Sequence, residues 1–174
     1  MTSTPKKPRK SSTVVAKTPR KRVAKKHTLP PNPFVNEILD YVAAQKSKIA
    51  KVEALKEHRN DALVSILIWN FDETVVSMIP EGDVPFTPND SPQGTDHTSL
   101  RREQRNLYHF VKGGNDSLNG IRRETMFIQM LEGLHPSEAR IVILAKDGRL
   151  DEEYSITYEQ VKEAYPDITW GGRS

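Results

Sequence analysis

The chain has 174 residues, with 26 Lys and Arg against 23 Asp and Glu and a formal net charge of +3; this length fits a single domain. It contains no cysteine, which excludes a disulfide framework, thiol catalysis and zinc sites with cysteine ligands. No apolar stretch approaches the roughly 18 residues of a membrane span, and the N-terminus lacks the apolar core of a signal peptide. We therefore expect neither a membrane protein nor a secreted one.

The charge is divided between two segments. Residues 1–33 contain no Asp or Glu and carry +10, whereas residues 34–174 hold all 23 acidic residues against 16 basic ones and carry −7. Such a division is typical of a basic arm joined to an acidic body. The ten basic residues of the arm are Lys6, Lys7, Arg9, Lys10, Lys17, Arg20, Lys21, Arg22, Lys25 and Lys26.

The arm has few apolar residues and six prolines, so the sequence predicts that residues 1–33 are disordered. Two short segments, Thr4-Pro5-Lys6-Lys7 and Thr18-Pro19-Arg20-Lys21, place two cations after a Thr-Pro turn. They resemble the repeated motif of linker-histone tails, which contacts the minor groove of A·T-rich DNA. Duplex DNA is therefore the favoured partner of the arm. An acidic protein surface, a nuclear-localisation signal and a solubilising tail without a partner are the alternatives.

Periodic apolar residues predict a first helix from Pro33 to about residue 58, with Asn32 as its cap. A second helix begins at Asn60 and Asp61 and has dense apolar content up to Phe71. Six prolines and glycines then predict a loop at residues 80–97. Its acidic residues do not have calcium-loop spacing.

Four further helices complete the predicted body. We expect them at about 98–112, ended by Gly113-Gly114-Asn115, at 117–132, from Pro136 to Lys146, and from a Thr157–Gln160 capping box to Ala164. His135 directly precedes Pro136 and is predicted to begin the fifth helix rather than to bind a metal. The expected fold is all-α, a single compact domain of about six helices over residues 34–174.

No residue pattern predicts catalysis. The five histidines do not cluster, and no phosphate-binding glycine loop or nucleophile elbow is present. We expect a non-enzymatic protein without cofactor or metal; an enzyme with a site in the 80–97 loop is a weaker alternative.

One group of arginines has two interpretations. Two antiparallel helices would bring the group together as a second candidate phosphate-binding face. The alternative, favoured by the acidic body, is that these arginines form salt bridges to Glu103, Glu124 and other acids, with Tyr108 and Phe110 in the core. The group consists of Arg101, Arg102, Arg105, Arg122 and Arg123.

A series of short motifs occupies the region from about 69 to 170. They include Ile79-Pro80-Glu81-Gly82, Leu107-Tyr108-His109-Phe110-Val111, Arg122-Arg123-Glu124, Phe127-Ile128-Gln129, His135-Pro136, Leu144-Ala145-Lys146-Asp147 and Glu163-Ala164-Tyr165-Pro166. In this order they resemble an uncharacterised family of small proteins from large contractile-tailed bacteriophages, of the cyanophage myovirus type. The resemblance implies a viral origin and a non-enzymatic accessory or virion role, with no catalytic residues.

Together these observations predict a phage accessory protein that binds duplex DNA non-specifically through its basic arm, with the helical body as a protein-interaction module. The alternative is a virion or assembly component whose arm docks on an acidic protein and whose body forms oligomers. Either role places the protein in the host cytoplasm or the virion.

Overall fold

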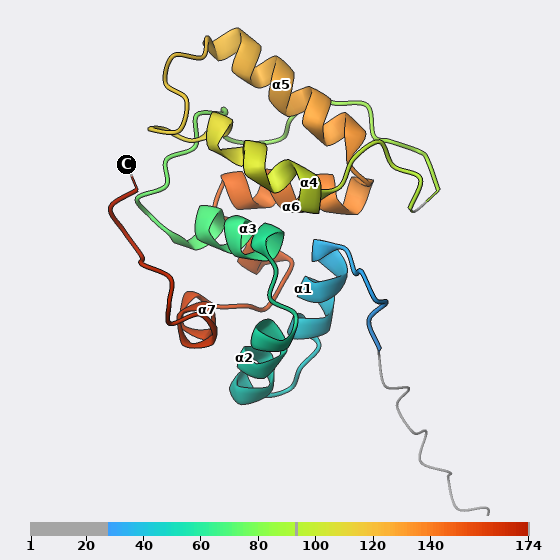
Figure 1. The fold of residues 1–174 in the computed structure, drawn as a ribbon, viewed down its shortest axis with the longest axis vertical. Coiled ribbons are helices and arrows are strands. Elements are labelled where there is room, and N and C mark those ends of the chain that lie inside the picture. The colour runs from blue at the N-terminus through green and yellow to red at the C-terminus, as the bar shows by residue number, and fades with distance from the viewer. Residues whose placement is uncertain (1–27, 93, 174) are drawn as a thin grey trace, which may run out of the picture.

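A computed structural model describes residues 28–92 and 94–173 of the chain. Within these residues the fold is all-α, as predicted (Figure 1). The predictions for residues 1–27, among them disorder and DNA contact, lie outside the described residues. The α-helices are α1 (Val35–Ala43), α2 (Lys48–Glu57), α3 (Asp61–Phe71), α4 (Leu100–Glu103), α5 (Gly120–Gly133), α6 (Pro136–Lys146) and α7 (Tyr158–Ala164). Two 3₁₀-helices, η1 (Gln104–Phe110) and η2 (Leu150–Glu152), follow α4 and α6.

Helix α6 lies at the centre of the body. It packs against α1, α3 and α5, and every residue from Ile141 to Ala145 is buried. Helix α5 covers α6 at one end of the molecule, whereas α2 and α7 pack together at the other end (Figure 1). A helix that is apolar on all sides needs neighbours on all sides, so the central position of α6 confirms the prediction from its sequence.

Several predicted helix boundaries are confirmed. The Asn60 side chain accepts a hydrogen bond from the Leu63 amide (3.0 Å) at the start of α3. His135 begins α6, where its Nδ1 accepts from the Ser137 amide (3.3 Å). The capping box of Thr157 and Gln160 begins α7.

The predicted single helix from Pro33 to about residue 58 is wrong, because the chain forms two helices with a break after Ala43. The Ser47 side chain caps α2 by accepting a hydrogen bond from the Ala50 amide (3.1 Å), and a serine at this position favours a new helix start. Ile49 is one of the periodic apolar residues of this region, yet it is 73% exposed. Asn32 does not cap α1; the Phe34 amide donates to the Glu37 carboxylate (2.7 Å) instead.

The predicted α-helix at 98–112 is only four residues long and continues as η1. A 3₁₀-helix has three residues per turn, so Leu107 and Phe110 share one side. Both are buried, whereas Tyr108 between them is 49% exposed. The prediction that Phe110 is a core residue is confirmed, and that for Tyr108 is wrong.

The loop between α3 and α4 contains no helix in its described residues, as predicted for 80–97, and it begins earlier, directly after Phe71. Its first part makes a turn at residues 73–74 and then forms a single bridge between Ser77 and Val111. Val84 and Phe86 pack against the core, and the Thr87 amide donates to the Glu132 carboxylate (3.1 Å). The loop is therefore held against α5 and α6.

Candidate functional site

All ten basic residues of the predicted arm lie outside the described residues. The last part of the arm, residues 28–33, contacts the body: Leu29 packs against the core, and Arg101 Nη2 donates to the Pro33 carbonyl (3.1 Å). The body therefore begins near Thr28, and the ten cations precede it.

The structure separates the five candidate arginines into two groups. The Thr98 amide donates to the Gly133 carbonyl, so α4 begins beside the end of α5. Arg123 Nε donates to the His109 carbonyl (2.9 Å), so α5 begins beside the end of η1. These two contacts are separated by ten residues of α5, or about 15 Å at 1.5 Å per residue. The antiparallel arrangement thus keeps Arg101 away from Arg123 (Figure 1).

Arg123 has a structural contact. Its side chain is buried, and the guanidinium donates to the carbonyls of His109, Asn115 and Leu118 at 2.9–3.0 Å. These bonds hold the turn between η1 and α5. Of the group, Arg102, Arg105 and Arg122 are exposed on the surface together with Arg101.

The predicted salt bridges of this group are wrong. Within the described residues no ion pair joins these arginines to Glu103 or Glu124. Glu103 accepts hydrogen bonds from Thr98 (2.7 Å) and Asn106 (3.0 Å). The arginines whose contacts are resolved, Arg101 and Arg123, bond to backbone carbonyls.

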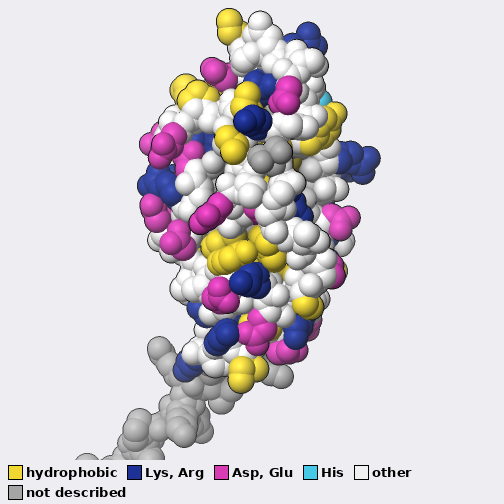
Figure 2. Space-filling view, turned by 90° about the vertical axis from the view of Figure 1, so that its left-hand side faces the viewer, with side chains coloured by type: hydrophobic (Ala, Val, Ile, Leu, Met, Phe, Trp, Pro, Cys, Tyr) yellow, Lys and Arg dark blue, Asp and Glu magenta, His cyan; other side chains and the backbone are white. Residues whose placement is uncertain are grey.

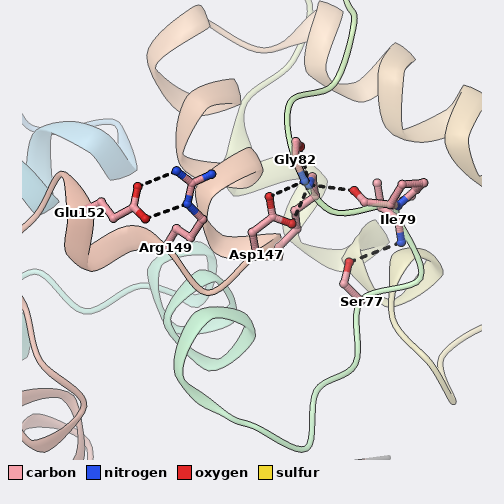
Figure 3. Close-up of polar contacts among 8 residues, drawn as sticks. Ser77, Ile79, Gly82, Asp147, Arg149 and Glu152 are labelled. Atoms are coloured by element: carbon pink, nitrogen blue, oxygen red, sulfur yellow. Dashed lines mark hydrogen bonds and ion pairs between the residues drawn. The ribbon is translucent and has the colours of Figure 1, made fainter.

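Lys146 and Asp147 form a buried ion pair at the C-terminal end of α6, with Nζ and Oδ1 2.7 Å apart. Lys146 also donates to the carbonyls of Pro80 (2.9 Å) and Gly82 (2.8 Å), and the Gly82 amide donates to Asp147 (3.1 Å). Figure 3 shows the approach of this turn to Asp147. The ammonium has three donors and all are used, so the pair holds this turn against the end of α6.

Glu138, in the first turn of α6, is fully buried. Its carboxylate accepts hydrogen bonds from the amides of Leu100 (2.8 Å) and Val35 (3.3 Å), the first residues of α4 and α1. Burial raises the pKa of the Glu138 carboxyl above its ordinary value, and the two amide bonds only partly oppose this effect. Sequence analysis did not predict these contacts with two other helices.

Asp72 ends α3 and also fixes the C-terminal segment. Its buried carboxylate accepts hydrogen bonds from Thr74, from the Gly171 amide (3.0 Å) and from Arg173 Nη1 (2.7 Å). Burial raises the pKa of Asp72, but the hydrogen bonds outweigh burial and hold the pKa below its ordinary value. Residues 168–173 consequently lie beside the end of α3.

A cavity of about 540 Å³ opens beside Asp72, between the end of α3, α7 and the C-terminal segment. Three aromatic side chains line it: Phe71 stacks against Tyr158 (centroids 6.3 Å apart), and Tyr158 meets Trp170 edge to face (5.1 Å, 88°). The acidic residues Glu73 and Asp151 are in the same lining, which contains no Lys or Arg. Figure 2 shows this side of the molecule, where hydrophobic side chains gather near the middle with both acidic and basic side chains beside them. Sequence analysis missed this site because its residues come from distant segments.

No three His, Asp or Glu side chains lie close enough together to hold a metal ion in the part of the chain that the structure describes. None of the helices described there is long and apolar enough to cross a membrane.

No curated protein and no solved structure matches the chain. The model of a protein family of unknown function, DUF6433, matches residues 38–152. This match covers more than half of the chain and supports an uncharacterised family, as the motifs suggested, without a link to phages. The matched region is shifted toward the N-terminus from the region of the motif resemblance, which runs from about 69 to 170. It includes Arg123, Glu138 and the Lys146–Asp147 pair. The chain therefore belongs to the DUF6433 family of unknown function.

Proposed function

We propose that this protein is a non-enzymatic accessory protein that associates with duplex DNA without sequence specificity, through its basic N-terminal segment. The observation that carries the proposal is a charge of +10 with no acidic residue over residues 1–33, joined to a body of −7. Each phosphate contact releases condensed counterions, so a segment with ten cations binds duplex DNA with a steep salt dependence.

The two Thr-Pro-basic-basic segments refine this proposal. A turn that presents two adjacent cations fits the narrow minor groove of A·T-rich DNA, where the negative potential is enhanced. We expect a preference for A·T-rich duplexes superimposed on non-specific binding.

The helical body is proposed as a protein-interaction module. Its buried charged residues, among them Arg123, Glu138 and Lys146, make contacts that stabilise the fold, which supports a scaffold rather than an enzyme. Ile49 on α2 and Ile121 on α5 are 73% and 79% exposed. They are single exposed side chains on separate helices rather than one apolar patch, so the proposal of an interaction module is supported mainly by the scaffold-like contacts above.

Fluorescence anisotropy with labelled duplexes tests the proposal. We compare the full chain with a full-length variant whose ten basic residues before Thr28 are replaced by Gln, across a salt series. The expected log–log slope for the wild type is steeper than about −4, and the variant loses most binding. A matched control, R102Q/R105Q/R122Q, removes three exposed cations from the body and leaves most of the affinity. Equal binding by the wild type and the arm variant overturns the proposal.

The second candidate function is a virion or assembly component whose basic segment docks on an acidic protein. The −7 charge of the body favours it, because a second copy of this chain offers an acidic surface. The motif resemblance supports a phage setting for both functions. Sedimentation of the wild type and the arm variant distinguishes them: self-association that requires the ten cations, without DNA binding, favours the assembly role.

A further inference from the structure

The cavity beside Asp72 has the chemistry of a site for a cationic side chain. The faces of Tyr and Trp rings carry negative charge density that attracts ammonium and guanidinium groups. Tyr158 and Trp170 stand nearly perpendicular, so two aromatic walls form a corner. Glu73 and Asp151 add two carboxylates that are exposed and have no ion-pair or hydrogen-bond partner among the described residues.

The third carboxylate, Asp72, is already neutralised by Arg173, so the excess negative charge of the cavity comes from Glu73 and Asp151. The aromatic group beside the cavity already attracts a cation of the body. Lys162 Nζ lies 4.7 Å from the centroid of the Tyr158 ring, although Lys162 is not part of the cavity lining. Because Lys162 and the stacked Phe71 ring both contact Tyr158, the groups that remain for a further cation are Trp170 and the carboxylates of Glu73 and Asp151.

We infer that this cavity binds Lys and Arg side chains of the chain's own basic segment, residues 1–26. Charge complementarity selects this occupant: the segment carries +10 without an acid, and the lining has acids without a base. The segment is also long enough to reach the cavity. The 27 residues before Thr28 can span up to roughly 90 Å when extended, and a domain of this size is expected to be about 40 Å wide. The cavity of about 540 Å³ lies within the usual range for ligand sites.

Docking has a consequence that rests on the proposed function. Cations held in the cavity are not available to phosphates, so the body competes with DNA for the basic segment. The cavity thus regulates the segment, and removal of its two carboxylates strengthens DNA binding.

Trp170 provides a direct readout of docking that does not involve DNA. A synthetic peptide of residues 1–27 is titrated into the full-length variant whose ten N-terminal cations are replaced by Gln. We expect a saturable change in tryptophan emission, which W170F abolishes because the other tryptophan, Trp69, lies in the core. The E73Q/D151N change in the same background weakens peptide binding about tenfold, from loss of the charge-assisted contacts.

The matched control is E81Q/E124Q, which removes the same charge from exposed residues outside the cavity. It leaves the peptide affinity within about twofold, because neither carboxylate lines the cavity and exposed charges are screened by solvent and salt. Equal weakening by both double variants overturns the inference, as does the absence of any saturable signal.

DNA binding of the chain with its native basic segment separates the two proposals. Stronger DNA binding by E73Q/D151N than by E81Q/E124Q supports docking within the chain. Peptide binding at the cavity without any DNA binding by the wild type contradicts the proposed function and leaves the docking site in place. A third outcome is that the wild type binds DNA, both double variants change this binding equally, and the peptide gives no signal. This outcome contradicts the docking site but not the proposed function.

Discussion

The two ends of α6 bury opposite charges and satisfy them differently. At the N-terminal end, Glu138 accepts backbone amides from α1 and α4 and has no ion-pair partner within the described residues. At the C-terminal end, Lys146 donates to two carbonyls and also pairs with Asp147. The acidic residue lies at the N-terminal end of α6 and the basic residue at its C-terminal end, which is the arrangement that the helix dipole favours. The comparison shows that a buried charge is accommodated here by backbone groups, with or without a counterion.

The largest expected effect comes from removing the Lys146 charge at the C-terminal end of α6. K146M removes the ammonium and leaves the Asp147 carboxylate buried without its partner, a loss of about 3–5 kcal/mol in the free energy of unfolding. Urea denaturation measures it. The double variant K146M/D147L is expected to lose less than K146M alone, because it leaves no buried charge; a larger loss would contradict this account.

The N-terminal end is expected to be less sensitive, because a substitution of Glu138 also removes a buried carboxyl group whose desolvation costs stability and so offsets part of the loss. E138A leaves the amides of Val35 and Leu100 without an acceptor, at about 1–3 kcal/mol each. E138Q keeps one acceptor oxygen and is expected to lose roughly half as much. The same denaturation measurement ranks the variants. If E138Q and E138A lose the same stability, the amide contacts do not account for the effect.

The pH dependence distinguishes the two ends further. The pKa of Glu138 is raised in the folded protein, so the native state holds the proton more tightly than the unfolded chain. The resulting stabilisation is fully present below the ordinary pKa of 4.5 and is lost as pH rises through the native pKa. As pH rises through the native pKa of Glu138, we expect the free energy of unfolding of the wild type to fall relative to that of E138Q. The K146M variant keeps Glu138 and is expected to show the same pH dependence as the wild type. If the free energies of unfolding of the wild type and E138Q change with pH in the same way, Glu138 is not the group responsible for the pH dependence.

The smallest effect is expected for an ion pair on the surface. Arg149 and Glu152 lie 2.7 Å apart just beyond the Lys146–Asp147 pair (Figure 3), but both side chains are about half exposed. Solvent and salt screen such pairs. R149Q is therefore expected to unfold at the same urea concentration as the wild type, and a clear shift would show that burial does not separate the two pairs.

Local signals in the sequence were sufficient for much of the fold. The apolar run in α6 predicted its central position, and the caps at Asn60, His135 and Thr157 predicted three helix starts. The break before Ser47 and the 3₁₀ geometry around Tyr108 were missed. In both places the periodicity was compatible with a continuous α-helix. The Ser47 cap is a local signal that outweighs this periodicity, whereas the 3₁₀ geometry accompanies the burial of Leu107 and Phe110 in the core.

The contacts that define the candidate site were not predictable from local patterns. Glu138 and Val35 are 103 residues apart, Lys146 and Pro80 are 66 apart, and Asp72 and Gly171 are 99 apart. A sequence shows that a carboxylate or an ammonium is present, but its partner depends on how the helices meet. The aromatic cavity beside Asp72 has the same origin, because Phe71 and Trp170 meet only in the folded chain.

The Glu138 contact also determines how the body responds to mechanical force. Tension on the basic segment enters the folded body near Thr28 and passes along residues 28–35. There Arg101 holds the Pro33 carbonyl and Glu138 holds the Val35 amide, so the force is shared with α4 and α6. A terminal helix without such contacts frays first under strain. Helix α1 is instead anchored to the centre of the protein, and the body is expected to stay folded while its N-terminal segment is pulled.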